Sequence, residues 1–462
     1  MHNKKKITKV KNFWHTHNTK IVFSVILLIF LCYSVFIALN IKLGIVNDEI
    51  THFDFSKQFS TTLGIPPELP EAYKYGVYIT QSPFLYYWIN GRVINIIDIF
   101  SASMSDWQLL IIMRLLSTIY SLGTIIFCYL FSKEFINHKW WRLLPPFFLS
   151  NTIMFVFLSG GVSYDNLTNL FSMAGLFFLA RVFNHKNFIP NSLAWMISIA
   201  LAILTKFAVL PLALAMAITW IIFLIKNKNC IFPLKFNGGK VIILSFIFIL
   251  LIVGNLAIYG YNLVVFKALI PGCEDILSKE QCKFDFYVIR NERYGLEEKL
   301  TILESIRLGY PNPLFYLIYW IKRIINNIFG IGSHRSYSII FIFPLHFTIL
   351  SWAFSIAIIN KKKISFKILC FIAIFAFLFF TVFIFNYNSE LSSGFAHFAI
   401  HGRYLFPVIG ILYITFTKAL MHITHKIVRK YSLIFALFAY FITGPFTFIY
   451  FYNVVFSDWF IR

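Results

Sequence analysis

Asn47-Asp48-Glu49, followed by His52, is the first of four short segments that place ionisable side chains beside strongly apolar stretches. Two adjacent carboxylates with a histidine three residues on suit a general base or a divalent-cation site. The alternative is a helix N-terminus, where acidic residues cap the helix and favour its dipole. Charges are costly inside a membrane, about 2.5–3.5 kcal/mol on insertion scales, so ionisable groups beside apolar runs are candidates for function.

Two further segments each contribute one charged residue. Tyr164-Asp165-Asn166 places Asp165 between two apolar runs, at a position where a helix cap belongs, so capping is its alternative role. Lys206 lies in ILTKFAVLPL, again between apolar runs. Its alternative role is to extend its ammonium group toward lipid headgroups.

The fourth segment is His401-Gly402-Arg403-Tyr404, which opens an apolar run, with His397 one turn earlier. An arginine fork at the start of a helix, where backbone N–H groups are free, suits a phosphate. Each segment alone is a weak signal. Their convergence on one face of the protein would be a stronger one.

The composition identifies the surroundings of these segments as a membrane. Hydrophobic residues make up 59% of the chain and charged residues 13%, with a mean hydropathy of +0.74. A soluble domain carries roughly 25% charged residues. The net charge of +22 does not indicate a nucleic-acid partner, because the basic residues fall between apolar blocks rather than on one continuous face. We therefore expect an all-α polytopic membrane protein.

Runs of roughly 17–25 apolar residues are long enough to cross a bilayer as helices. The sequence predicts eleven such spans, of which the fifth is the shortest. They are residues 21–40, 107–131, 142–160, 165–183, 191–205, 207–225, 239–260, 338–359, 364–386, 403–421 and 431–453.

Loop charges set the orientation. If the basic N-terminus is cytoplasmic, the Lys- and Arg-rich loops all fall on the cytoplasmic side, as the positive-inside bias requires. Of the 19 acidic residues only Glu134 falls there, and the C-terminus ends outside. All four ionisable segments then lie at the outer face.

Two large outer segments follow from this topology, at 41–106 and 261–337, within a single domain over 1–462. Residues 83–100 and 311–330 are expected to be interfacial helices, because polar and aromatic residues interrupt their apolar character. Cys273 and Cys282 share a polar outer stretch, where a disulfide is permitted. Two free thiols are the alternative.

Several common catalytic motifs are absent from the sequence. It has no GxxxxGK[ST] loop, no GxGxxG after a strand, no HExxH and no GxSxG. A membrane enzyme without a nucleotide site needs a donor available at its outer face, and a lipid-linked phosphate satisfies that condition.

The stretches NDEITHF, QSPFLYYW, YDNLTNLF, LTKFAVLPL and HGRYLFPV occur in this order over residues 47–408. In this respect the chain resembles the GT-C class of polytopic glycosyltransferases that use polyprenyl-phosphate sugars, in particular the aminoarabinose- and mannosyltransferase-like branch. The chain has no large C-terminal soluble domain of the kind found in oligosaccharyltransferases, which disfavours that branch. The resemblance implies a helical bundle, interfacial helices in the first outer loop and a cavity that faces outward.

The resemblance also implies roles for individual residues. Asp48 would be the catalytic base, and Glu49 and His52 would orient it or the acceptor. Asp165 would be a second catalytic group. Gln81 stands where many relatives carry His or Lys, which weakens a phosphate or metal role there and leaves an acceptor or orienting role. The residues that would hold the donor phosphate are Lys206, His401, Arg403 and Tyr404.

The implied reaction is inverting transfer of a sugar from undecaprenyl phosphate to a hydroxyl of a glycan or glycolipid acceptor, such as O-antigen or lipopolysaccharide. Glucose is the expected sugar by analogy with serotype-converting transferases, on the resemblance alone. The sequence identifies no cofactor, and it is compatible with a divalent cation. One alternative is a transporter or flippase of lipid-linked saccharide, which would need charges near mid-membrane and repeated halves. Another is a noncatalytic assembly factor.

Overall fold

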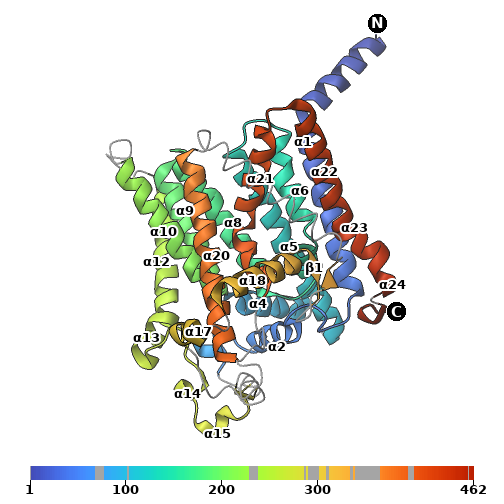
Figure 1. The fold of residues 1–462 in the computed structure, drawn as a ribbon. Helices are drawn as coiled ribbons and strands as arrows, with labels where there is room; N and C mark the ends of the chain where they lie inside the picture. The colour runs from blue at the N-terminus through green and yellow to red at the C-terminus, as the bar shows by residue number, and fades with distance from the viewer. Residues whose placement is uncertain are drawn as a thin grey trace.

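A computed structural model describes residues 2–67, 78–100, 104–227, 238–285, 288–289, 301–308, 312–332, 337–338, 365–393, 400–455 and 457–461. Over these residues the protein is almost entirely helical (Figure 1). The strands β1 (Gly330–Ile331) and β2 (Tyr337–Ser338) form one short antiparallel ladder in which Gly330 pairs with Ser338.

Nine described helices are long and apolar enough to cross a membrane, and a tenth candidate is a bent pair. The protein is therefore a polytopic membrane protein, as the composition predicts. The nine are Asn18–Asn40 (in α1, His2–Asn40), Asp106–Lys133 (α5), Tyr164–Phe183 (α8), Phe188–Thr205 (α9), Phe207–Lys226 (η3, Phe207–Val209, and α10, Leu210–Lys226), Gly239–Phe266 (α12, Gly239–Asn255; η4, Leu256–Gly260; α13, Tyr261–Phe266), Phe366–Leu391 (in α20, Phe366–Ser393), Gly402–His422 (η6, Gly402–Val408, and α21, Ile409–His422) and Lys426–Tyr450 (beginning with α22, Lys426–Thr443).

The predicted span 142–160 is not one straight helix. After η2 (Trp141–Leu143) it consists of α6 (Leu144–Ser150) and α7 (Ile153–Ser159), bent by 63° at the break. The break has a local cause, because Asn151 Nδ2 donates to the Phe147 carbonyl and Thr152 Oγ1 donates to the Phe148 carbonyl. The Thr152 N–H donates to the Leu149 carbonyl at 3.1 Å and not to that of Phe148, whose carbonyl accepts from the Thr152 hydroxyl instead, so the helix ends here. The predicted span 338–359 lies outside the described residues, apart from Ser338.

The two ends of the bundle differ in what they carry. At one end, which we call the N-terminal end, Lys186 forms an ion pair with Glu134 at 2.8 Å, and Lys367 donates to Asn184 at 2.8 Å. Glu134 is the acidic residue that the charge pattern placed with the basic loops. The opposite end, which we call the loop end, carries the C-terminal end of α1 and the segments described next (Figure 1).

The loop end is built from short helices and from the C-terminal segment. Helix α2 (Glu49–Ser60) packs on α4 (Leu85–Phe100), and α2 and α18 (Pro313–Ile328) run across the bundle axis (Figure 1). Residues after α22 return to this end, where Ile461 N donates to the Asn40 carbonyl at 2.8 Å. The remaining short elements are η1 (Ile79–Gln81), α14 (Cys273–Ile276), α15 (Lys279–Cys282), α17 (Ile302–Leu308), α23 (Pro445–Thr447), η7 (Phe448–Tyr452), α24 (Asn453–Val455) and η8 (Ser457–Trp459).

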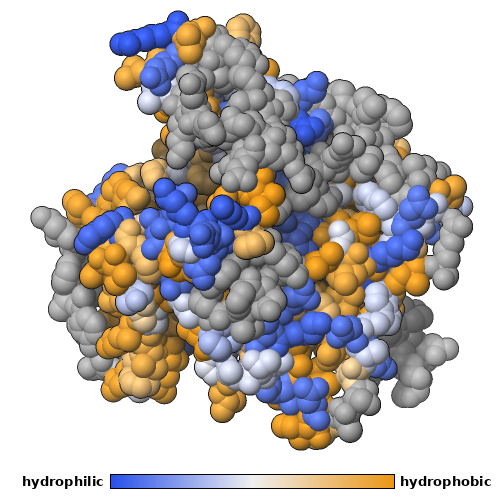
Figure 2. Space-filling view, turned by 90° about the horizontal axis from the view of Figure 1, so that it is seen from below, coloured by the Kyte–Doolittle hydropathy of each residue, from blue (hydrophilic) through white to orange (hydrophobic). Residues whose placement is uncertain are grey.

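Apolar packing holds these parts together in one large core and several smaller clusters. The large core joins most of the spans and is rich in aromatic pairs such as Phe148 with Tyr440, whose ring centroids lie 4.5 Å apart. A separate cluster beneath the loop end joins α2, α4, α5 and the start of α8 through residues such as Phe59 and Tyr86. Seen from the loop end, hydrophilic and hydrophobic residues are mixed over the surface (Figure 2), which is typical of a face in contact with headgroups and water.

Candidate functional site

Four charged residues that are far apart in the sequence meet at the loop end. Arg403 Nη2 lies 2.7 Å from Asp48 Oδ2, and Arg403 Nη1 lies 3.5 Å from Asp165 Oδ2. Lys206 Nζ lies 2.5 Å from the other oxygen of Asp165. The structure therefore brings together Asp48, Asp165, Lys206 and Arg403, one from each of the four segments, and we call these residues the charge cluster.

Asp48 is positioned by an unusual backbone conformation. It directly precedes α2 with φ 57° and ψ 15°, in the left-handed region, and its side chain makes no capping hydrogen bond. A residue other than glycine pays roughly 1 kcal/mol or more to hold this conformation, although Asp tolerates it better than most. Contacts with the surrounding structure offset this cost. The left-handed conformation directs the Asp48 carboxylate toward Arg403 and away from the N-terminus of α2. The helix-cap alternative is therefore wrong for Asp48.

Asp165 does not cap a helix either. Ser163 caps α8, since its hydroxyl accepts from the Asp165 N–H at 3.3 Å, which leaves the Asp165 carboxylate free to bind Lys206. Lys206 ends α9 with an extended backbone, φ −156° and ψ 121°, that turns its side chain away from the helix. Its ammonium lies 4.5 Å from the ring centroid of Tyr164 and 5.0 Å from that of Tyr404. Lys206 thus points into the cluster, and its side chain is only 11% exposed, so it does not extend to headgroups.

The segment that carries Arg403 enters the site as the 3₁₀ helix η6. It passes very close to α18 at Gly402, where a Cβ atom would lie 2.6 Å from the Ile324 carbonyl oxygen. Only glycine permits this approach. The preceding residue, His401, is buried, and its Nε2 accepts from Asn47 Nδ2 at 2.9 Å. The motifs at 47–49 and 401–404 are therefore joined twice, once through this pair and once through Asp48 and Arg403.

The charge cluster is balanced, with two carboxylates and two cations, which lowers the cost of burying it. Its members differ in access to solvent. The side chains of Asp165 and Arg403 are 5% and 8% exposed, whereas that of Asp48 is 34% exposed. Asp48 is thus the carboxylate that a solute can reach most directly.

His52 lies beside the cluster on α2 and is 2% exposed. Its Nδ1 shares a hydrogen bond of 2.9 Å with the Tyr87 hydroxyl, and its ring stands edge-on to that of Tyr164 at 4.3 Å. Within the described part of the chain its Nε2 has no hydrogen-bond partner. Burial lowers the pKa of His52 to about 4, against an opposing effect of the nearby Asp48 and Asp165 carboxylates. The imidazole is therefore neutral near pH 7.

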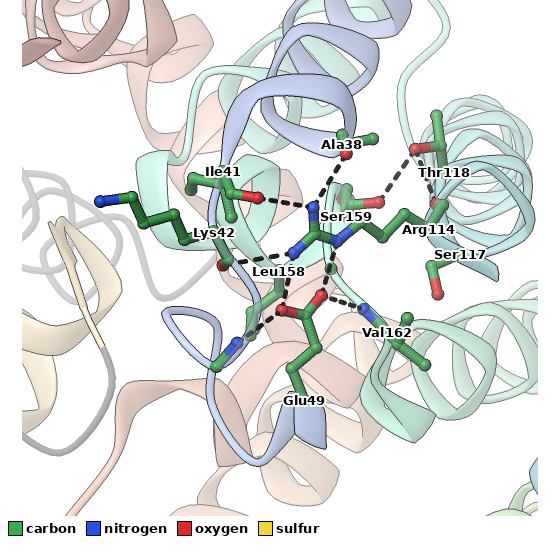
Figure 3. Close-up of polar contacts among 12 residues, drawn as sticks. Ala38, Ile41, Lys42, Glu49, Arg114, Ser117, Thr118, Leu158, Ser159 and Val162 are labelled. Carbon is green, nitrogen blue, oxygen red and sulfur yellow. Dashed lines mark hydrogen bonds and ion pairs between the residues drawn. The ribbon is translucent and has the colours of Figure 1, made fainter. Parts of the chain in front are cut away.

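Glu49, which the sequence suggested as a catalytic residue beside Asp48, lies apart from the charge cluster. It is fully buried and forms a two-pronged ion pair with Arg114 of α5, with Nε–Oε1 and Nη2–Oε2 distances of 2.8 Å (Figure 3). The backbone N–H groups of Gly44 and Val162 donate to the same carboxylate, at 3.2 and 3.1 Å. This placement favours a structural or positioning role over contact with a substrate.

Gln81 and the two cysteines lie in other parts of the loop end. The Gln81 side-chain oxygen accepts from the Thr80 hydroxyl at 2.6 Å, and its carbonyl accepts from Asn262 at 3.0 Å. Cys273 and Cys282 form a disulfide with a Cα–Cα distance of 5.7 Å. His397 lies outside the described residues. In the described ranges no three His, Cys, Asp or Glu side chains are grouped so that they could hold a metal ion.

Comparisons with known proteins identify the fold. No protein-family model matches the sequence, and no curated protein sequence matches it. Among solved structures, the chain is similar to the Archaeoglobus fulgidus oligosaccharyltransferase tethered to an acceptor peptide, with a TM-score of 0.53 and 14% identity over 93% of this chain and 55% of that one. It is also similar to Archaeoglobus fulgidus AglB in complex with an inhibitory peptide and a dolichol-phosphate, with a TM-score of 0.50 and 14% identity over 93% and 56% of the two chains.

A third similar structure is ArnT from Cupriavidus metallidurans bound to undecaprenyl phosphate, with a TM-score of 0.47 and 16% identity over 90% of this chain and 62% of that one. The chain thus spans a little over half the length of the oligosaccharyltransferase chains that it matches. The similarity to the two oligosaccharyltransferase structures shows that the chain shares their fold, a polytopic helical fold of the kind that the resemblance in the sequence implies.

Proposed function

We propose that this protein is a glycosyltransferase that moves a sugar from a polyprenyl phosphate to a hydroxyl of a glycan or glycolipid, with Asp48 as the general base. The observation that carries the proposal is the charge cluster, because it combines one accessible carboxylate with two cations whose side chains are no more than 11% exposed. An acceptor hydroxyl is a poor nucleophile until a carboxylate takes its proton during attack. The structurally similar AglB binds a dolichol-phosphate, a donor carrier of the same chemical class.

Arg403 and Lys206 would hold the phosphate. Departure of the lipid phosphate leaves negative charge on its oxygens, and cations in a partly dehydrated site stabilise that charge. Both cations are now bound to carboxylates, so a donor phosphate would compete with Asp48 for Arg403 and with Asp165 for Lys206. Once the phosphate takes the guanidinium, Asp48 is a stronger base. Asp165 keeps the two cations in place between turnovers. Tyr404 and His401 lie in the same segment as Arg403.

His52 would orient the acceptor or the donor sugar. Burial keeps its imidazole neutral near pH 7, so it acts by hydrogen bonding and not by carrying charge. Its Nε2 lacks a partner in the described residues and is available to a substrate hydroxyl. Gln81 precedes α4 and is half-buried at the same end of the bundle, where it would contact the acceptor.

We further propose that the loop end faces the periplasm of a bacterial cell and that 1–462 act as one domain. The described Lys and Arg residues at the N-terminal end, such as Lys186 and Lys367, fit a cytoplasmic surface. The disulfide in the segment 261–337 fits an oxidising compartment. A periplasmic site would receive its donor laterally from the outer leaflet, and O-antigen or lipopolysaccharide is the acceptor that this location favours. Glucose is the sugar we propose, by analogy.

The test is transfer by the purified protein in nanodiscs. Undecaprenyl-phosphate-linked glucose, galactose and mannose, each radiolabelled in the sugar, are supplied with lipopolysaccharide that carries O-antigen. We expect labelled lipopolysaccharide with the parent, loss of labelling in Asp48→Asn, and parent-like labelling in Asp106→Asn. Asp106 is a suitable control because it lies at the same end with its side chain 74% exposed. Equal labelling by parent and Asp48→Asn, or no labelling from any of the three donors, would overturn the proposal.

A further inference from the structure

The buried pair of Glu49 and Arg114 connects the two backbone segments that carry the carboxylates of the charge cluster. Glu49 directly follows Asp48 in the chain. Val162, whose N–H donates to Glu49 Oε1 at 3.1 Å, lies three residues before Asp165. The Glu49 carboxylate therefore belongs to the segment that carries Asp48 and accepts a hydrogen bond from the segment that leads to Asp165 (Figure 3).

Arg114 extends this connection to the end of the first span. Its Nη1 donates to the carbonyls of Ala38 and Ile41 at 3.0 and 2.7 Å, and its Nη2 donates to the Lys42 carbonyl at 3.3 Å. Ala38 lies in the last turn of α1, and Ile41 and Lys42 begin the segment that leads to Asp48. Such carbonyls have no partner within a helix, and here a guanidinium supplies it.

Every polar position of the pair is used. A guanidinium has five N–H donors, and those of Arg114 go to two carboxylate oxygens and three carbonyls. The Glu49 carboxylate accepts four hydrogen bonds, two from Arg114, one from Gly44 and one from Val162. A buried ion pair that is fully satisfied is rigid, because a shift of either side chain leaves a buried charge without a partner.

A close fit of the backbone brings the segments into reach. At Gly161 a Cβ atom would lie 2.5 Å from a Val46 side-chain carbon, so only glycine lets the turn before α8 approach residues 44–48 so closely. Asp48, which has the left-handed backbone conformation, lies in the chain between Val46 at this contact and Glu49. The pair is thus placed where it can hold a strained residue in its conformation.

We propose that Glu49 and Arg114 are positioning residues, which fix Asp48 relative to Asp165 without touching the substrate. This inference rests on the proposed function, in which Asp48 takes the proton from the acceptor. The pair sets the direction in which the Asp48 side chain points. It also sets the distance between the segments that carry Asp48 and Asp165. A misplacement of about 1 Å in a catalytic group costs roughly 100-fold in rate.

The proposal is tested with Arg114→Lys and Glu49→Gln in the full-length protein. Lysine keeps the charge of Arg114 but has three donors on one nitrogen and cannot bridge the carboxylate and three carbonyls. We expect kcat per folded molecule to fall about 100-fold in either variant, with the donor KM unchanged, because Lys206 and Arg403 still hold the phosphate. The matched control is Arg181→Gln, an arginine at the N-terminal end of the bundle, which leaves both constants as in the parent.

Parent-like kcat per folded molecule in both variants would overturn the positioning role, because a purely structural pair changes only the amount of folded protein. A second readout is independent of activity, namely hydrogen exchange measured by mass spectrometry in nanodiscs. Arg114→Lys should exchange faster both at 40–48 and at 160–166, with 405–420 unchanged. Parent-like exchange in either of the two segments would overturn the proposal.

The two readouts separate this inference from the proposed function. A parent protein that transfers no sugar from any donor contradicts the proposed function. In that case hydrogen exchange still decides whether the pair holds the two segments together.

Discussion

Asp48 and Arg403 lie 355 positions apart in the sequence and are joined by an ion pair of 2.7 Å at the loop end. The contact pairs the proposed base with a proposed phosphate ligand, so Asp48 Oδ2 and Arg403 Nη2 stay bound to each other until another anion takes the guanidinium. A donor phosphate supplies the reason for separation, because it offers Arg403 another anion and leaves Asp48 free to accept a proton. The donor is therefore expected to bind before the acceptor reacts.

This competition predicts the effect of Asp48→Asn on phosphate binding. A hydrogen bond to a charged group is worth about 1.5–3 kcal/mol, so loss of the competing carboxylate should tighten binding of undecaprenyl phosphate by roughly tenfold or more. Isothermal titration of the protein in nanodiscs measures the Kd. Weaker binding than in the parent would show that Asp48 helps to hold the phosphate and does not compete with it.

Removal of the cations should have the opposite effect. Arg403→Gln and Lys206→Gln each delete a charge that would contact the phosphate, and each should raise the donor KM about tenfold or more. Each also leaves a carboxylate with one cation fewer, so the thermal stability of the folded protein must be measured in parallel. Lys57→Gln serves as the control, since Lys57 pairs with Asp106 away from the charge cluster. A donor KM unchanged in both variants would contradict the phosphate assignment.

The burial of His52 leads us to expect that the free energy of unfolding depends on pH. Its pKa is about 4 in the folded protein, below the value near 6.5 in an unfolded chain, because burial disfavours the charged imidazole. The unfolded state then binds more protons between these values, so the stabilising contribution is fully present above pH 6.5 and is lost as the pH falls toward 4. The loss amounts to about 3 kcal/mol.

The measurement is thermal unfolding in detergent at pH values from 7.5 to 4.5. His52→Gln should flatten the fall in Tm on acidification, whereas substitution of the exposed His138 by Gln should leave the fall unchanged. An equally steep fall in His52→Gln would assign the acid sensitivity to other groups.

We expect substitutions of Glu49 and Arg114 to have non-additive effects on the free energy of unfolding. Removal of one partner leaves a buried charge unpaired and costs about 3–5 kcal/mol. The double variant Glu49→Gln/Arg114→Gln has no unpaired charge, so its loss should be clearly smaller than the two single losses together. Denaturant unfolding of the four proteins gives the coupling energy. Additive losses would show that the two side chains stabilise the fold independently.

The convergence of the charge cluster could be predicted from the sequence, because alternating spans place 48, 165, 206 and 403 at the same end of a bundle. Their pairing could not. Loop charges indicate which end of the bundle a residue occupies. They do not indicate that Ser163 caps α8 in place of Asp165, and they do not indicate that the extended backbone of Lys206 turns its side chain inward.

The role of Glu49 was harder to predict for a geometric reason. Adjacency to Asp48 suggested a shared role, yet Asp48 has a left-handed backbone conformation and α2 begins only at Glu49, so the two side chains leave the chain in different directions. Arg114 carried a usable signal, since an arginine inside an apolar span needs an acidic partner. The sequence offered several such partners. The bend at Asn151 and Thr152 escaped prediction because an average over an apolar window does not register two polar residues without a proline.

The most direct measurement is a single-turnover experiment with Asp48→Asn at saturating undecaprenyl-phosphate-linked sugar and fixed acceptor. The account predicts that the rate of transfer falls about 10²–10⁴-fold, the usual contribution of a general base, while donor binding is kept or tightened. Transfer at the parent rate by a variant that binds the donor normally would contradict the central claim, that Asp48 takes the proton from the acceptor.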